Sequence, residues 1–244
     1  MSGFENLEKT KLSADDRMAV ERFCWEAREA LGEKLLSITL YGSAARGDYA
    51  PGGSDINILV LTASLDLTAL QGLLDPVSRG LRAGIHPLLM TETDLKSSAD
   101  IYPVKYLSMK ESYLPLWGED PLAGLTVARE HIRLRCEQEM MNQLLRLRRH
   151  YVYHGGWGLA DKIASGVTGF LENLRYALSL DRETPMTREE AIAAAEKYGV
   201  PPEALRGAWA LKTDPEGARE IERVYEEYLK AVERAVRMID SMGG

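Results

Sequence analysis

The hydrophobic pattern divides the chain into a first part with short apolar runs and a second part with helical periodicity. In the first part, apolar positions recur at helical spacing after a capping serine, Ser13, and stop near Gly32, which predicts a helix. A second helix, interrupted near Pro76, is expected over 67–84. Short β-rich runs predict three strands, at 35–41, 56–61 and 85–90. This order of elements favours a small mixed sheet with helices packed on it.

From about Pro103 onward the pattern favours helices, and no convincing strand is expected. Thr187 and Glu190 have the spacing of a capping box ahead of a further helix. The last helix is expected from about Asp214, with an apolar stripe on one face and charged residues on the other. On that charged face, i,i+4 pairs are expected between Glu226 and Lys230 and between Glu233 and Arg237. The other helical segments are 105–112, 124–153 and 159–180. The second half therefore predicts a helical bundle.

The change in pattern predicts two domains, 1–115 and 122–244, joined where Pro, Gly and acidic residues cluster within 113–125. With 244 residues, 45% of them hydrophobic, the chain can bury a core without metals or disulfides. Cys24 and Cys136 have no pairing pattern and no metal-ligand spacing, so both are expected to be free thiols in a reducing cytoplasm. The polar N-terminus and the absence of a long apolar run predict no membrane partner.

The net charge of −7 disfavours long nucleic acid as a partner, because such binding depends on Lys and Arg that neutralise phosphates. The basic residues of segment 124–153 are interpreted as a solvated helix face; they are Arg133, Arg135, Arg146, Arg148 and Arg149. His131 and His150 are interpreted as having no partners at metal-ligand spacing.

Candidate chemistry is concentrated in residues 40–60, LYGSAARGDYAPGGSDINILV. Gly42 permits a tight turn, and a short helix starting near Ala44 would direct its backbone N–H groups, with Ser43, at an anion. Asp55 opens the next strand, and residues 55 and 57 share a face because strand side chains alternate. Two oxygen ligands beside a phosphate loop predict a magnesium–nucleotide site, with Asn57 as the second ligand.

This stretch resembles the signature of the nucleotidyltransferase superfamily that includes DNA polymerase beta. The matching residues are Gly42, Ser43, Ala45, Arg46, Gly47, Ser54, Asp55 and Ile56, and the loop between Gly47 and Ser54 is one residue longer than is usual. The helix-rich second half is similar to the bundle of stand-alone members such as aminoglycoside nucleotidyltransferases. The resemblance implies an α/β (α+β) nucleotidyltransferase fold with a small mixed sheet, followed by an all-α helical bundle.

The resemblance also implies Mg²⁺ or Mn²⁺ as the metal and a nucleoside triphosphate, expected to be ATP, as substrate. Gly42, Ser43, Arg46 and Ser54 are then expected to bind the nucleotide, and Asp55 to be both a metal ligand and catalytic. The family carries a third carboxylate on the next strand, where this sequence has His86. Glu92 cannot replace it, since six residues of strand span roughly 20 Å.

With Asn57 and His86 in place of acids, Asp55 would hold one metal with help from substrate phosphates. His86 is a candidate base for the acceptor hydroxyl, because imidazole has a reference pKa near 6.5. Pro87 predicts that its strand lies at a sheet edge or is bulged, because proline lacks a ladder donor.

Two functions follow from this reading. One is an enzyme that transfers a nucleoside monophosphate to a hydroxyl of a small molecule or a protein, with the helical domain selecting the acceptor. The alternative is a catalytically impaired nucleotide-binding, regulatory or antitoxin-like module without turnover, which pairs with a partner protein. The sequence leaves the choice between them open. It also leaves the oligomeric state open.

Overall fold

The computed structural model describes residues 4–50, 54–182, 184–214 and 220–242. The chain divides into two compact units. The first contains residues 1–99 and 105–126, and the second contains residues 100–104 and 127–244. The expected start of the last helix near Asp214 adjoins residues 215–219, which lie outside the described residues. In the described part, no helix combines the length and apolar character that a membrane crossing requires.

The first unit is built on a four-stranded mixed sheet in the order β3-β2-β1-β4. β1 (Leu35–Tyr41) pairs antiparallel with β2 (Ile56–Thr62) and with β4 (Tyr113–Gly118), whereas β3 (Ile85–Thr91) pairs parallel with β2. The helices of this unit are η1 (Glu5–Lys9), α1 (Ala14–Leu31), η2 (Gly32–Lys34), α2 (Ser43–Arg46), α3 (Leu67–Arg82), α4 (Glu92–Ser97) and most of α5 (Pro103–Glu111). The expected mixed sheet with packed helices is confirmed.

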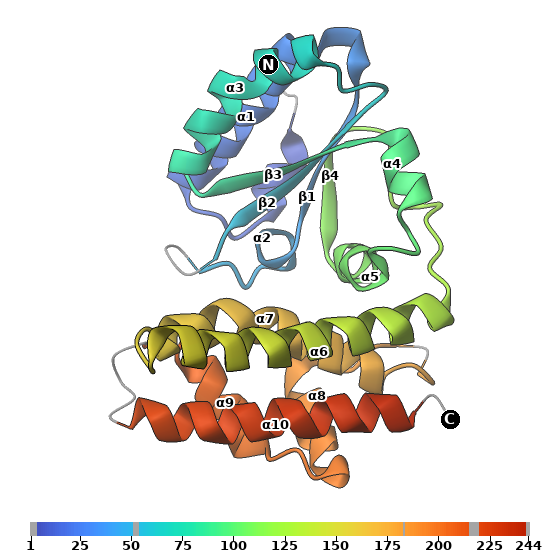
Figure 1. Ribbon diagram of the computed structural model, residues 1–244. Helices are drawn as coiled ribbons and strands as arrows, with labels where there is room; N and C mark the ends of the chain where they lie inside the picture. The colour runs from blue at the N-terminus through green and yellow to red at the C-terminus, as the bar shows by residue number, and fades with distance from the viewer. Residues whose placement is uncertain (1–3, 51–53, 183, 215–219, 243–244) are drawn as a thin grey trace. The chain divides into compact units, whose positions relative to one another are not determined.

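The two long helices α1 and α3 cover one face of the sheet (Figure 1). The buried cluster beneath them takes alternate residues of the central strands, among them Ile38 and Leu40 of β1 and Ile56, Ile58 and Val60 of β2. Because strand side chains alternate, Asn57 and the other odd positions of β2 point to the opposite face. The core therefore fixes the face on which the polar residues of β2 lie.

Two expectations from the sequence are wrong. β4 is a strand within the segment expected to hold none after Pro103, and it occupies an edge of the sheet. Pro115 interrupts its apolar pattern but is tolerated because an edge strand needs fewer ladder donors. α3 continues through Pro76 instead of being interrupted there. The expected edge position of the strand that carries Pro87 is confirmed, since β3 is the outermost strand of the described sheet, next to β2.

The second unit is helical, as expected. α6 (Arg129–His154) packs on α7 (Leu159–Leu178) and on α10 (Ile221–Ser241), and α7 also contacts α8 (Arg188–Ala195) and α9 (Pro202–Ala210). A short turn, η3 (Glu196–Tyr198), follows α8. The expected capping box at Thr187 and Glu190 is present, because each residue bonds the backbone N–H of the other.

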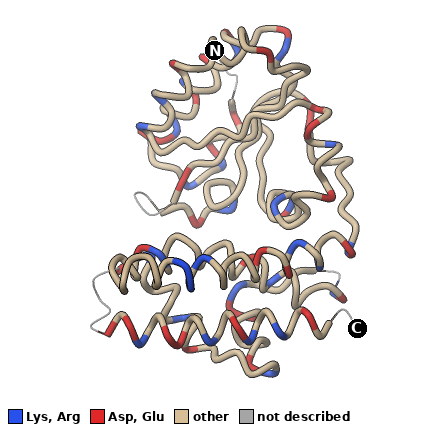
Figure 2. The backbone as a smooth tube through the Cα atoms, viewed as in Figure 1, with Lys and Arg blue, Asp and Glu red and all other residues tan. Residues whose placement is uncertain are grey.

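Charged residues of both signs alternate along α10 (Figure 2). The expected Glu226–Lys230 pair is present. Glu233, however, accepts a hydrogen bond from Arg148 of α6 at 2.7 Å, where the sequence suggested Arg237. An ion pair between helices thus takes the place of the local one.

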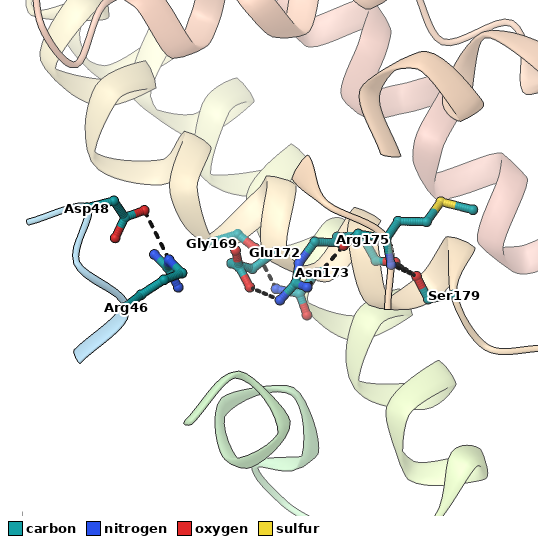
Figure 3. A network of polar contacts seen from close by, with 8 residues as sticks. Arg46, Asp48, Gly169, Glu172, Asn173, Arg175 and Ser179 are labelled. Carbon is teal, nitrogen blue, oxygen red and sulfur yellow. Dashed lines mark hydrogen bonds and ion pairs between the residues drawn. The ribbon is translucent and has the colours of Figure 1, made fainter. Parts of the chain in front are cut away.

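The C-terminal end of α7 is held by a polar network (Figure 3). Arg175, only 7% exposed, donates to the Glu172 carboxylate at 2.9 Å and to the Met186 carbonyl at 3.1 Å. Ser179 donates to the Arg175 carbonyl and accepts from the Met186 N–H. These bonds fasten the segment after α7 to the helix itself.

Candidate functional site

Three segments of the first unit meet at one edge of the sheet, the edge formed by the C-terminal end of β1 and the N-terminal ends of β2 and β3. β1 ends at Tyr41, just before Gly42, and the antiparallel β2 begins at that same edge, just after Asp55. β3 runs parallel to β2 and therefore also begins there, close to His86. The topology thus gathers the glycine–serine turn, the acid and the histidine, although Gly42 and His86 are 44 positions apart in the sequence.

The strand register aligns the polar residues in a row. Asn57 lies opposite Tyr41 on β1 and opposite His86 on β3, and Tyr41 lies opposite Tyr113 on β4. Partners in register project on the same face of a sheet, which here is the face away from α1 and α3.

The acid, the amide and the imidazole are in close contact. His86 Nε2 lies 3.4 Å from Asp55 Oδ1, and Asn57 Nδ2 donates to the Asp55 carbonyl in a long bond of 3.4 Å. The side chains of Asp55 and His86 are 62% and 48% exposed, so both groups are open to a ligand. A Cβ atom built on Gly42 would lie 3.6 Å from Asn57 Nδ2, which places the turn directly against this cluster.

The turn itself depends on glycine. Gly42 has a φ of +75°, which side chains rarely allow, and it caps the single-turn helix α2. The N–H groups of Ala45 and Arg46 bond the Gly42 carbonyl, and that of Gly47 bonds the Ser43 carbonyl. Ser43 and Ala44 are the first residues of α2, where helix geometry leaves backbone N–H groups without an intrahelical acceptor.

Two further predicted site residues, Arg46 and Ser54, form contacts within their own loop. Arg46 Nε donates to Asp48 Oδ2 at 3.0 Å, so its guanidinium is turned toward a neighbour in the loop (Figure 3). The Ser54 N–H bonds the Ala50 carbonyl. Residues 51–53, where the longer loop was predicted, lie outside the described residues. The roles of both residues in nucleotide binding stay predictions.

The donor set fits a metal only in part. Asp55 supplies a carboxylate and Asn57 an amide oxygen, which are ligands that Mg²⁺ accepts when substrate phosphates complete its coordination. Among the described residues, no group of three or more His, Cys, Asp or Glu side chains is arranged to hold a metal ion. A resident metal held by protein ligands alone does not match this site, whereas a metal that arrives with the nucleotide does.

Sequence reasoning missed the tyrosines around the cluster. Burial raises the pKa of Tyr41 to about 12, so its hydroxyl stays protonated at neutral pH. Burial also raises the pKa of Tyr49, with smaller contributions from the carboxylates of Asp16 and Asp55. Tyr113 donates to Asp120 Oδ2 at 2.7 Å. The one signal in the sequence for such a tyrosine was that Tyr41 ends the predicted strand 35–41, directly before Gly42.

Comparisons with known proteins agree with this geometry. Residues 24–104, one third of the chain, match the family model of the nucleotidyltransferase domain. A spectinomycin adenyltransferase from Enterococcus faecialis, solved with ATP and spectinomycin, is similar in structure with a TM-score of 0.59. It is 13% identical, and the match covers 89% of this chain and 98% of that one.

A toxin–antitoxin structure with AMP-PNP gives a TM-score of only 0.30 at 22% identity, over 55% of this chain and 94% of that one, which is too low to carry an argument. Comparison with curated protein sequences gave no match. The family model spans the residues that carry the signature, and the adenyltransferase shares the fold. The chain is therefore a nucleotidyltransferase-fold protein with a helical C-terminal part.

Proposed function

We propose that this protein transfers a nucleoside monophosphate from a nucleoside triphosphate to a hydroxyl group of an acceptor. The observation that carries the proposal is the convergence of the Gly42–Ser43 turn, Asp55 and His86 at one edge of the sheet. We further propose ATP as the nucleotide and a small hydroxylated molecule as the acceptor, because the similar adenyltransferase was solved with ATP and spectinomycin. A protein hydroxyl remains the second class of acceptor.

In this reaction the acceptor oxygen forms a bond to the α-phosphorus, and the bond from that phosphorus to the oxygen leading to the β-phosphate breaks. Pyrophosphate leaves, and the hydroxyl proton passes to a base. His86 is the proposed base, since it is exposed and lies at the cluster. The N–H groups of Ser43 and Ala44 would stabilise phosphate charge as it develops.

Asp55 and Asn57 would hold the divalent cation, Mg²⁺ or Mn²⁺, together with the triphosphate. When bound, such a cation neutralises phosphate charge and polarises the reacting phosphoryl group. We propose that the helical unit selects the acceptor.

The test is pyrophosphate release from ATP in the presence of Mg²⁺ or Mn²⁺ and a panel of hydroxylated acceptors. Asp55→Ala should lower turnover at least about a hundredfold, because the carboxylate that contacts His86 and would hold the cation is lost. Asp75→Ala, which removes an exposed aspartate on α3, is the matched control and should leave turnover unchanged. Equal loss in both variants would contradict the proposed site.

A second candidate function is nucleotide binding without turnover. The specific observation in its favour is that Asn57 and His86 occupy positions where the family carries acids, which leaves the cluster poor in negative charge. Under this alternative, ATP with Mg²⁺ raises the melting temperature of the wild-type protein, and Asp55→Ala weakens that effect, while no acceptor yields pyrophosphate. Acceptor-dependent pyrophosphate release excludes the alternative.

A further inference from the structure

A pair of histidines lies at the C-terminal end of α6, outside the site described above. His150 and His154 are four residues apart on one helix, and i,i+4 side chains lie on the same face. Their ring centroids are 4.6 Å apart, with the planes inclined at 38°. The interpretation that His150 has no partner at metal-ligand spacing did not pair it with His154, whose ring lies beside it.

We propose that His150 and His154 form a binding site for a divalent transition-metal ion of the kind that prefers imidazole ligands, such as Zn²⁺, Ni²⁺ or Cu²⁺. Two imidazoles bound to one tetrahedral ion, with metal–nitrogen distances near 2.0–2.1 Å, have ring centres about 5 Å apart. The observed separation of 4.6 Å is close to that spacing, so small rotations of the two side chains suffice.

The tautomer of His150 is already suited to a metal. Its Nε2 atom lies 2.9 Å from the Trp157 carbonyl oxygen. A carbonyl can only accept, so Nε2 must carry the hydrogen, and the neutral ring keeps its lone pair on Nδ1. Metal-binding histidines characteristically donate their second N–H to a carbonyl or carboxylate in this way, which fixes the ring and its tautomer.

The turn after α6 allows the Trp157 carbonyl to reach His150. Gly155, Gly156 and Gly158 all have positive φ angles, and a Cβ atom built on Gly158 would lie 3.9 Å from His150 Nε2. The glycines thus bring the Trp157 carbonyl back over the last turn of α6. The bond therefore results from a specific backbone path of the turn.

The electrostatic setting also favours a cation. α6 is 26 residues long, and the partial negative charge of its dipole lies at the end that carries the two histidines. Arg148 is paired with Glu233 at 2.7 Å, whereas the exposed Arg149, next to His150, adds one positive charge near the site. His154 is exposed and His150 half-buried, so an ion can enter from solvent. Since no third His, Cys, Asp or Glu completes a ligand set in the described part of the chain, water supplies the remaining coordination.

The test uses the tag-free full chain carrying Asp55→Ala, so that the nucleotide site does not contribute to metal binding. Titration calorimetry with Zn²⁺ should show one site per chain. His150→Ala and His154→Ala should each lower its affinity at least about tenfold, because a single exposed imidazole remains. His131→Ala, which removes the histidine at the other end of α6, is the matched control and should leave Zn²⁺ binding unchanged.

A second measurement does not depend on affinity. In the electron paramagnetic resonance spectrum of the Cu²⁺-loaded protein, hyperfine structure should report two nitrogen ligands in the parent and one in either variant. Circular dichroism checks that the variants are folded, which His154→Ala should be since that side chain is exposed. The proposal is overturned if both variants bind Zn²⁺ as the parent does, or if His131→Ala removes the site.

Discussion

At the scale of single residues, the candidate site differs from the three-carboxylate pattern by an amide and an imidazole. Asn57 and His86 are partners in register, and His86 contacts Asp55 at 3.4 Å. The three side chains thus lie together as the family pattern implies, but they carry less negative charge than three carboxylates would. A cation at this edge would be held by one formal negative charge and by whatever charge the nucleotide brings.

The first prediction restores that charge. Replacing both residues, Asn57→Asp with His86→Asp, should raise the affinity for Mn²⁺ by roughly tenfold or more, since two carboxylates join Asp55 on one edge. Free Mn²⁺ is measured by electron paramagnetic resonance in the absence of nucleotide. Asn142→Asp, on α6, controls for an added negative charge elsewhere. Unchanged Mn²⁺ affinity in the double variant would mean that the two side chains do not face a common cation.

At the scale of elements, the end of β4 closely approaches the backbone of β1. Gly118 has a φ of +78°, and a Cβ atom built there would clash with the Leu36 carbonyl oxygen. Gly118→Ala should therefore lower the free energy of unfolding by about 2–4 kcal/mol, through strain and the steric clash. Urea unfolding measures it.

Gly124→Ala is the matched control for this substitution. A Cβ atom built on Gly124 meets nothing within 4 Å, so the change should stay within about 0.5 kcal/mol. Similar losses for the two variants would contradict the placement of β4 against β1.

A second element, the start of α8, gives a prediction about pH. Hydrogen bonds from the Thr187 backbone and then from its side chain lower the pKa of Glu190 from its ordinary value of 4.5. A folded-state pKa below the unfolded one means that the carboxylate stabilises the fold above about pH 4.5 and that this contribution is lost as the pH falls.

Glu190→Gln keeps an acceptor at the cap but does not titrate. The wild-type protein should exceed this variant in free energy of unfolding at pH 7, and the difference should shrink at pH 3. Urea unfolding at both pH values measures the difference. A difference that is independent of pH would show that the capping box does not couple to protonation.

The elements also show what sequence could and could not reveal. The strand 56–61 and the helix after Thr187 carry strong local signals, a largely apolar run and a capping box, and both are present. β4 was missed because Pro115 and Gly118 break its pattern, and only its pairing with β1 makes it a strand. The capping box of Thr91 and Asp94 was missed because it directly follows β3.

In the candidate site, too, some residues carry a local sequence signal and others are brought together only by strand pairing. Gly42, Ser43 and Asp55 were accessible because they lie within one short motif. The contact between His86 and Asp55 depends on the parallel pairing of β3 with β2. The placement of Tyr41 beside Asn57, and of Tyr113 beside Tyr41, depends on register across β1, β2 and β4, which no local pattern encodes.

At the scale of the whole molecule, charge is spread rather than concentrated. The net charge is −7. The arginines of α6 are largely paired with acids, as in Arg133–Glu137 at 3.0 Å and Arg135–Glu139 at 2.8 Å. Each such partly exposed pair contributes modestly to stability, but it removes a cation from the set that could meet phosphates. A continuous basic surface on α6 is therefore not expected.

The last prediction follows from the pairing of these arginines with acids. A 20-base-pair DNA duplex or an RNA of similar length should bind more weakly than about 100 μM at 150 mM salt, because few unpaired cations are available to release counterions. Fluorescence anisotropy with labelled oligonucleotides measures this. As a control, Glu137→Gln with Glu139→Gln frees Arg133 and Arg135 and should tighten binding at low salt. Tight binding by the wild-type protein that weakens steeply with salt would contradict the prediction, and would make a nucleic-acid hydroxyl a serious candidate for the acceptor.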